Sequence, residues 1–269
     1  MLVTSIIIHQ MNLSISLAQM QVATGDFQKN SSRGLNLIQE AVSSKSDLIL
    51  FPEMWTAGFD YTNCHDYAIS NRSFLGKLQQ ISDEKQISIG GSYLTENENH
   101  FYNEFVLIQP KSALQSYRKV HLFHLMDEDT YLSPGEKVSV IQTRWGLTNL
   151  SVCYDLRFPD MFRLSREKGV TLILMAAGWP LKRIDHWKIL LRARAIENQL
   201  FFAAVNCVGG DTKAPFGGAS AVIGPWGETI LEAKSDSEQL INGNIDLEEV
   251  DRIRKNYPFF QNRRNNYST

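Results

Sequence analysis

The chain passes from a strand into a helix within one stretch, Leu150-Ser151-Val152-Cys153-Tyr154-Asp155-Leu156-Arg157-Phe158-Pro159. The residues up to Cys153 are typical of a short apolar strand, and Pro159 is typical of the first turn of a helix. Such a tight turn presents its side chain at the end of a sheet, and the N–H groups at the helix start point into the same space. The local dipole there favours a thiolate, so Cys153 is a candidate nucleophile. The competing interpretation is a buried structural cysteine, the commonest fate of a free Cys.

Charged residues also follow two other predicted strands. One stretch is Leu48-Ile49-Leu50-Phe51-Pro52-Glu53, and the other is Tyr117-Arg118-Lys119-Val120-His121-Leu122. Functional groups of α/β proteins cluster just beyond the carboxyl ends of strands, which makes Glu53 and Lys119 candidates. Taken singly, each has an ordinary alternative. Glu53 would cap a turn in water, and Lys119 would belong to a basic edge that discourages strand pairing.

The rest of the chain alternates short apolar segments with segments of helical periodicity. Strands are predicted over 13–20, 47–51, 88–93, 104–108, 113–117, 149–153, 172–175, 201–206, 218–223, 229–232 and 240–245. Helices are predicted over 30–43, 74–85, 158–168, 184–199 and 247–256. Residues 97–99 predict a hairpin turn. Because no linker or fixed repeat divides this pattern, we expect one α/β domain over 11–269, with two sheets and helices packed outside.

Composition excludes several classes of protein. The 269 residues are 43% hydrophobic and 21% charged, which is typical of a globular protein. A net charge of −2 gives no strong field to attract nucleic acid or an anionic membrane. No apolar stretch approaches the roughly 18 residues that span a bilayer. Three cysteines form no disulfide framework and suit the cytoplasm. Residues 1–10 carry no secretory signal and are expected to be a loose extension.

In combination, the three charged or nucleophilic stretches resemble the nitrilase (carbon–nitrogen hydrolase) superfamily. Gaps of 66 and 34 residues separate Glu53, Lys119 and Cys153, in the order and spacing of that family. The resemblance runs from about 13 to 246. Its later matches are Arg192-Ala193-Arg194-Ala195-Ile196-Glu197-Asn198, Asn206, Gly218-Ala219-Ser220 and Pro225-Trp226-Gly227-Glu228.

The resemblance implies a fold and a catalytic triad. The fold is a four-layer α-β-β-α sandwich of two mixed sheets flanked by helices, and members commonly pair as homodimers. Cys153 would be the nucleophile, Glu53 the general base and later acid, and Lys119 the stabiliser of the oxyanion. The backbone N–H of Tyr154 would add a second oxyanion donor. This division of roles is chemically sound, because a free thiol is only a few per cent ionised at neutral pH and needs a base.

Four further side chains are candidate site residues. Glu128 stands where the amidase branches of the family orient the lysine and contact substrate, or it belongs to a solvated acidic loop. Arg157 binds a substrate carboxylate, or it ties the turn to an acid such as Asp155. Trp179 is a pocket wall, or an ordinary packed tryptophan. Arg183 approaches an acidic substrate, or merely starts the next helix.

The resulting hypothesis is a cofactor-free hydrolase of a small linear carboxamide, similar to the ω-amidases that act on 2-oxoglutaramate. An N-carbamoyl amine or amino-acid hydrolase, a nitrilase and a non-catalytic scaffold are the alternatives. No metal site is expected, because the spacing of His121, His124 and Asp127 matches no standard zinc motif. Cys64, in a predicted polar loop, and Cys207, at the end of an apolar strand, are expected to be bystanders.

Overall fold

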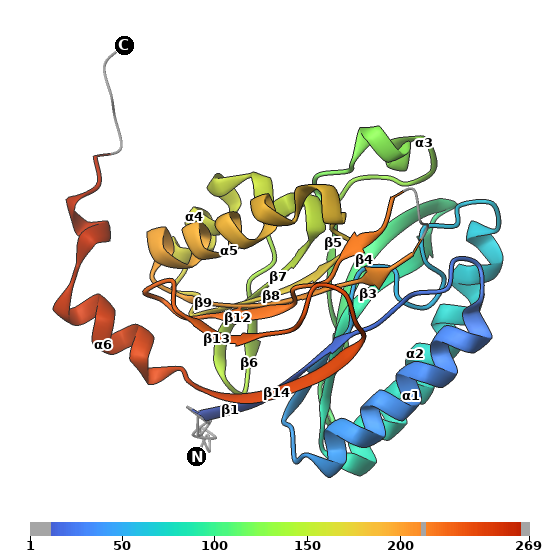
Figure 1. Cartoon of the computed structure of the whole chain (residues 1–269), viewed down its shortest axis with the longest axis horizontal. Coiled ribbons are helices and arrows are strands. Elements are labelled where there is room, and N and C mark those ends of the chain that lie inside the picture. Colours follow the sequence, from blue (N-terminus) through green and yellow to red (C-terminus); the bar gives the residue numbers. More distant parts are fainter. Residues whose placement is uncertain (1–11, 211–213, 265–269) are drawn as a thin grey trace, which may run out of the picture.

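Two six-stranded mixed sheets lie face to face in the computed structural model, which describes residues 12–210 and 214–264 (Figure 1). The first sheet has the order β14-β1-β2-β3-β4-β5 and the second β13-β12-β9-β8-β7-β6. The strands of the first are β1 (Asn12–Gln19), β2 (Leu48–Leu50), β3 (Ser88–Asn97), β4 (His100–Ile108), β5 (Gln115–Arg118) and β14 (Gln239–Asp246). Those of the second are β6 (Ile141–Thr143), β7 (Gly146–Val152), β8 (Leu172–Ala177), β9 (Phe201–Asn206), β12 (Ala221–Ile223) and β13 (Thr229–Glu232). A separate two-stranded ribbon joins β10 (Val208–Gly209) to β11 (Phe216–Gly217).

Helices cover the outer faces of both sheets. Figure 1 shows α1 (Phe27–Ser43) and α2 (Cys64–Lys85) on the outside of the first sheet. It shows α4 (Pro159–Glu167) and α5 (Ile184–Asn198) on the outside of the second. The short α3 (Glu128–Tyr131) lies at one end, and α6 (Glu248–Asn256) follows β14. The predicted four-layer α-β-β-α sandwich is therefore confirmed.

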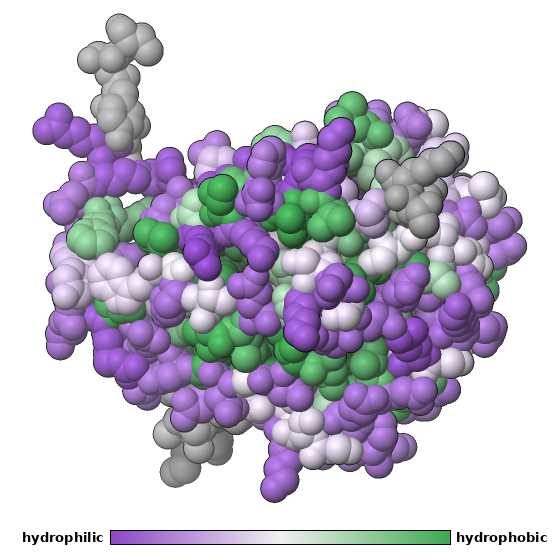
Figure 2. Space-filling view, in the orientation of Figure 1, coloured by the Kyte–Doolittle hydropathy of each residue, from purple (hydrophilic) through white to green (hydrophobic). Residues whose placement is uncertain are grey.

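The central strands are apolar on both faces, as expected for strands buried between layers. In β2, Leu48 and Leu50 belong to the core between the sheets, whereas Ile49 packs toward the helices. Polar residues cover most of the face shown in Figure 2, with apolar residues in smaller patches between them. Within the described residues, no helix is long and apolar enough to cross a membrane.

The predicted hairpin at 97–99 is confirmed. Asn97 pairs with His100, and the two residues between them, Glu98 and Asn99, have φ of 50° and 63°. Positive φ at both central residues is what a type I′ turn requires, and Asn adopts it more readily than most residues. This turn sets the register of β3 against β4.

Helix α2 begins earlier than predicted, at Cys64 rather than at 74. Cys64, Tyr67, Ala68 and Asn71 are buried at helical spacing, so the placement of Cys64 in a polar loop was wrong. The polar residues between these positions concealed the periodicity. The prediction also missed β6, β10 and β11, which have two or three residues each. The loose extension predicted for residues 1–10 lies outside the described residues, and the single domain over 11–269 stays a prediction.

Two buried tyrosines make the stability of the fold sensitive to alkali. Burial raises the pKa of Tyr93, and burial together with the negative charge of Asp155 raises that of Tyr117. A group whose pKa is raised by folding contributes stability below its unfolded pKa, about 10 for Tyr, and loses it above. We therefore expect the Tm to fall progressively above about pH 10, and to fall less steeply in Tyr93→Phe. Thermal melts from pH 8 to 11 check this; a constant Tm would contradict it.

Candidate active site

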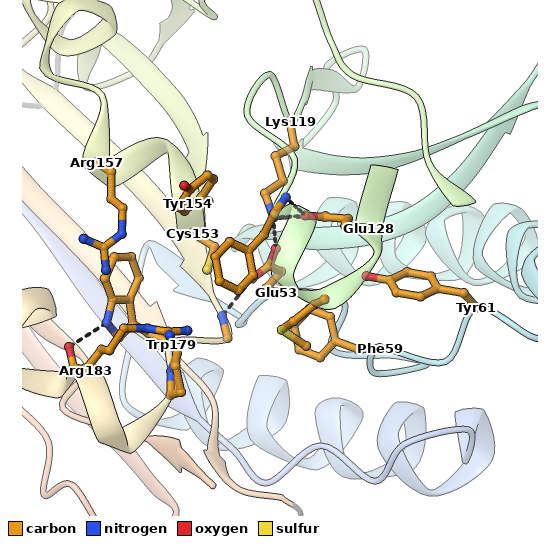
Figure 3. A pocket seen from close by; sticks show the side chains of 14 residues that line it. Glu53, Phe59, Tyr61, Lys119, Glu128, Cys153, Tyr154, Arg157, Trp179 and Arg183 are labelled. Carbon is orange, nitrogen blue, oxygen red and sulfur yellow. Dashed lines mark hydrogen bonds and ion pairs between the residues drawn. The ribbon is translucent and has the colours of Figure 1, made fainter. Parts of the chain in front are cut away.

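Three strand ends bring Glu53, Lys119 and Cys153 into one cavity between the two sheets (Figure 3). Glu53 follows β2, Lys119 directly follows β5, and Cys153 directly follows β7. The Lys119 Nζ atom donates to Glu53 Oε1 at 2.8 Å. Both side chains are almost completely buried, with 2% and 1% exposed. Water therefore screens this ion pair very little.

The turn at Cys153 has the predicted strand-to-helix geometry. Cys153 has a φ of 44°, a left-handed conformation that costs a residue other than glycine on the order of 1–3 kcal/mol. A single 3-10 turn over Cys153–Arg157 follows, and α4 then starts at Pro159. Such strain persists only where the surrounding structure enforces it.

Asp155 holds this turn in place and was missed as a functional residue. Its Oδ2 accepts hydrogen bonds from the Val152 N–H at 2.9 Å and the Tyr117 hydroxyl at 2.8 Å. Its Oδ1 accepts from the His121 N–H at 3.2 Å and lies 2.8 Å from His121 Nδ1. Asp155 thus joins the Cys153 turn of one sheet to the Lys119 segment of the other. In the described part of the chain, Arg157 forms no ion pair with it.

Glu128 is the second carboxylate that contacts the Lys119 ammonium. Lys119 Nζ donates to Glu128 Oε2 at 2.7 Å and to Oε1 at 3.0 Å, and the Phe123 N–H donates to Oε2 at 2.8 Å. Glu128 is buried, whereas its neighbours Asp127 and Asp129 are exposed. A solvated acidic loop therefore describes the neighbours but not Glu128.

Asn103, on β4, bridges the two carboxylates and was also missed. Its Nδ2 donates to Glu53 Oε1 at 2.8 Å and to Glu128 Oε1 at 3.1 Å. Its backbone carbonyl accepts a hydrogen bond from the Lys119 backbone N–H at 2.9 Å. An asparagine inside a strand carries no local signal. The register that pairs Glu104 with Arg118 is what brings Asn103 next to Lys119.

The electrostatics of the site favour a neutral thiol and a charged ammonium. Burial raises the pKa of Cys153 well above its usual value, the negative charge of Glu53 adds to this, and Lys119 opposes it. Burial alone would lower the pKa of Lys119, but the carboxylates of Glu53 and Glu128 outweigh it and raise that pKa. Burial and the Glu53 charge therefore dominate over the helix start, and the need for a base that the sequence predicts applies to Cys153.

The cavity combines an acidic–basic floor with aromatic walls. Its lining residues are Glu53, Phe59, Tyr61, Lys119, Phe123, Met126, Glu128, Cys153, Tyr154, Arg157, Gly178, Trp179, Pro180 and Arg183. Every candidate site residue from the sequence is among them. The sequence reasoning missed the aromatic residues Phe59, Tyr61 and Phe123, because nothing in their local pattern distinguishes them from core residues.

Trp179 forms one wall and is itself held from behind. Its backbone N–H donates to Asn206 Oδ1 at 2.6 Å, and its indole N–H donates to the Arg183 carbonyl at 2.8 Å. The guanidinium of Arg157 lies 4.8 Å from the centre of the indole ring, and that of Arg183 lies 5.3 Å from the Phe123 ring. Over residues 12–210 and 214–264, neither arginine forms a salt bridge with an acidic side chain. Arg157 Nη2 lies 3.3 Å from His186 Nδ1, so the guanidinium keeps its positive charge uncompensated and can still bind an anionic ligand, as can that of Arg183.

The remaining histidines and cysteines do not gather at the cavity. His121 pairs with Asp155, whereas His124 pairs with Asp129. No group of three His, Cys, Asp or Glu residues within the described ranges is arranged to hold a metal ion. Cys207 is buried with its Sγ 3.9 Å from the Glu53 carbonyl. Cys64 is buried at the start of α2.

Comparisons with known proteins agree with this architecture. The carbon–nitrogen hydrolase family model matches residues 14–255. The 2-oxoglutaramate amidase of Bacillus subtilis is 35% identical over 253 residues, 93% of this chain and 97% of that protein. A carbon–nitrogen hydrolase superfamily protein from Xanthomonas campestris, solved with an arsenic adduct in its active site, is 30% identical with a TM-score of 0.84, over 96% of this chain and 99% of that one.

A third similar structure bears on the chemistry. It is a Glu→Gln mutant of the amidase from Nesterenkonia sp. AN1, showing covalent addition of the acetamide moiety of fluoroacetamide at its active-site cysteine. It is 25% identical with a TM-score of 0.80, and the match covers 93% of this chain and 96% of that one. The family model covers most of the chain, and the 2-oxoglutaramate amidase relative is similar along almost its whole length. The chain therefore belongs to the carbon–nitrogen hydrolase family of the nitrilase superfamily and is an amidase similar to the ω-amidase branch.

Proposed function

We propose that this amidase uses Cys153 to hydrolyse a small linear carboxamide through a thioester. The observation that carries the proposal is the convergence of Cys153, Glu53 and Lys119, each from a strand end, in one cavity. Because burial and the charge of Glu53 raise the pKa of the thiol, attack needs a base, and Glu53 is the carboxylate in the cavity whose charge acts on the thiol. The covalent adduct in the Nesterenkonia amidase supports a cysteine nucleophile in this fold.

The reaction proceeds in two halves. In the first, the thiol proton passes to Glu53 as Cys153 Sγ forms a bond to the amide carbon, and the carbonyl electron pair moves onto oxygen. The ammonium of Lys119 and the Tyr154 N–H stabilise this oxyanion. Glu53 then gives its proton to the leaving nitrogen, the C–N bond breaks, and ammonia departs. In the second half, Glu53 takes a proton from water as the water oxygen bonds to the thioester carbon. The C–S bond then breaks, Glu53 returns its proton to the sulfur of Cys153, and the acid leaves. This sequence balances without a cofactor.

We propose an α-keto acid ω-amide of the 2-oxoglutaramate type as the substrate. Such a molecule carries a carboxylate at the end opposite its amide. Arg157 and Arg183 line the cavity that holds Cys153 and carry no acidic partner among the described residues, which suits recognition of that carboxylate. The name of the Bacillus subtilis relative supports the same class. We also propose a homodimer, from the family resemblance, and a cytoplasmic location, from the three free cysteines.

Ammonia release from a panel of compounds tests the substrate. The panel contains 2-oxoglutaramate, 2-oxosuccinamate, glutamine, N-carbamoyl amino acids and a simple nitrile. We expect the keto-acid amides to have the highest kcat/KM. Carbon dioxide released together with ammonia would instead identify a carbamoyl hydrolase, and nitrile turnover above amide turnover would identify a nitrilase.

Replacing Arg157 tests recognition of the carboxylate. A charge-assisted hydrogen bond contributes about 1.5–3 kcal/mol, so Arg157→Met should raise the KM for 2-oxoglutaramate by about 10- to 100-fold. The KM for a small uncharged amide such as propionamide should change by less than about threefold, because it lacks the carboxylate. Arg192→Met is the matched control, since Arg192 bonds Thr229 and does not line the cavity. Equal losses for charged and uncharged amides would mean that Arg157 only supports the wall.

A further inference from the structure

Asn103 occupies the space between the two carboxylates that flank Lys119. Its side chain is fully buried on β4, and its Nδ2 lies 2.8 Å from Glu53 Oε1 and 3.1 Å from Glu128 Oε1. Lys119 Nζ contacts the same two oxygens, at 2.8 Å and 3.0 Å. The ammonium and the amide therefore close a ring with the two carboxylates.

The orientation of the Asn103 amide follows from the chemistry of its neighbours. A carboxylate only accepts hydrogen bonds, so the amide nitrogen must face both, and each of its hydrogens is used. The amide oxygen of Asn103 is buried and has no hydrogen-bond partner among the described residues. A buried carbonyl without a partner costs stability, so stability alone does not explain an asparagine here.

The hydrogen bonds to Glu53 leave one place for a proton. Oε1 accepts from Lys119 and from Asn103, which uses both of its lone pairs. Oε2 accepts from the Gly178 N–H at 2.9 Å and keeps its second lone pair. Glu53 and Cys153 line the same cavity, the negative charge of Glu53 acts on the thiol, and Oε2 is the oxygen with capacity to accept the thiol proton.

We infer that Asn103 is a positioning residue that makes Oε2 of Glu53 the proton acceptor for Cys153. It fills the second lone pair of Oε1, fixes the rotation of the carboxylate, and stabilises negative charge on both Glu53 and Glu128. The inference rests on the proposed function, since it specifies the first step of that reaction. In that step the proton leaves Cys153 Sγ for Glu53 Oε2, and the sulfur electron pair forms the bond to the electrophilic carbon.

Alkylation of Cys153 by iodoacetamide tests this without a choice of amide, because it needs only loss of the thiol proton. The rate is measured by mass spectrometry of the Cys153 peptide from pH 5 to 9 in the full-length protein. Asn103→Ala removes both donors, and Asn103→Ser keeps one with less loss of packing. We expect the acidic limb to move to higher pH by about one unit in Asn103→Ala, a tenfold lower rate on that limb, and by less in Asn103→Ser.

Asn71→Ala is the matched control for loss of a buried asparagine. Asn71 is fully buried in α2, and its amide bonds the Leu94 carbonyl and the Thr56 hydroxyl, away from the carboxylates. This variant should lower the Tm and leave the alkylation profile unchanged. On 2-oxoglutaramate, Asn103→Ala should lower kcat by about tenfold or more with the KM within about twofold, as for an interaction that acts on the chemical step.

The inference is overturned if both Asn103 variants keep the wild-type alkylation profile and lose only Tm, as Asn71→Ala does. Its failure is distinguishable from that of the proposed function. Wild-type protein in which Cys153 reacts no faster than Cys64 and Cys207 would overturn both. Normal alkylation with no turnover of keto-acid amides would overturn only the substrate, and the pH profiles would still decide the role of Asn103.

Discussion

Replacing Cys153 with alanine is expected to lower kcat for amide hydrolysis by about 10⁴-fold or more, the loss typical of removing a nucleophile from a triad. The reason is that the proposed thioester cannot form without this thiol. The thiol of Cys207 is not a substitute, because it contacts the backbone carbonyl of Glu53 and not the Glu53 carboxylate. Ammonia release under saturating 2-oxoglutaramate measures the effect. The Tm should change little, since the substitution removes one sulfur atom from a residue that packs at the margin of the core.

Cys64→Ala is the matched control for loss of a thiol. Cys64 lies at the start of α2, and its Sγ is 3.3 Å from the Tyr61 carbonyl, so its loss should leave kcat within about threefold of wild type. If activity survived in Cys153→Ala and disappeared in Cys64→Ala or Cys207→Ala, the nucleophile would be one of those two cysteines and not Cys153.

Lys119→Met is expected to lower kcat by about 10³-fold or more and also to destabilise the fold. One oxyanion donor is typically worth about 10²–10³ in kcat. In addition, Glu53 and Glu128 would face each other without the cation between them, and removing one partner of a buried ion pair costs about 3–5 kcal/mol. Steady-state kinetics and thermal melts on the same preparation measure both losses.

Lys119→Arg separates the catalytic from the structural contribution. A guanidinium restores the positive charge, but its planar fork does not reproduce the point contact of an ammonium. We expect Lys119→Arg to recover most of the lost Tm and little of the lost kcat. Equal recovery of both would indicate that Lys119 acts only by neutralising the carboxylates.

The sequence predicts the centre of this fold better than its edges. Residues 201–206 form β9 as predicted, because a strand buried on both faces is a continuous apolar run. The edge strand β6 has three residues, too few for a pattern. The first ten residues of α2 were missed because polar side chains alternate with the buried ones. Edges and partly solvated helices depend on tertiary contacts, which local pattern does not encode.

The candidate site divides in the same way. Glu53, Lys119 and Cys153 stand out in the sequence, since each follows a strand and the family resemblance gives their roles. Asn103 and Asp155 bond to partners that are distant in the sequence. Asn103 lies 50 residues from Glu53, and Asp155 lies 34 residues from His121. The pKa of Cys153 is not given by the local pattern for a related reason. It depends on burial and on a carboxylate from the other sheet, which a strand-to-helix turn alone does not indicate.

Mass spectrometry of the enzyme during turnover tests the central claim, that Cys153 carries the acyl group, most directly. Wild-type protein is mixed with excess 2-oxoglutaramate, quenched with acid within the first turnovers, and digested for peptide mapping. The account predicts the mass of the 2-oxoglutaryl group on Cys153, absent from Cys64, from Cys207 and from the Cys153→Ala variant. Steady ammonia release with the acyl group on another residue, or with Cys153 unmodified at every quench time, would contradict it.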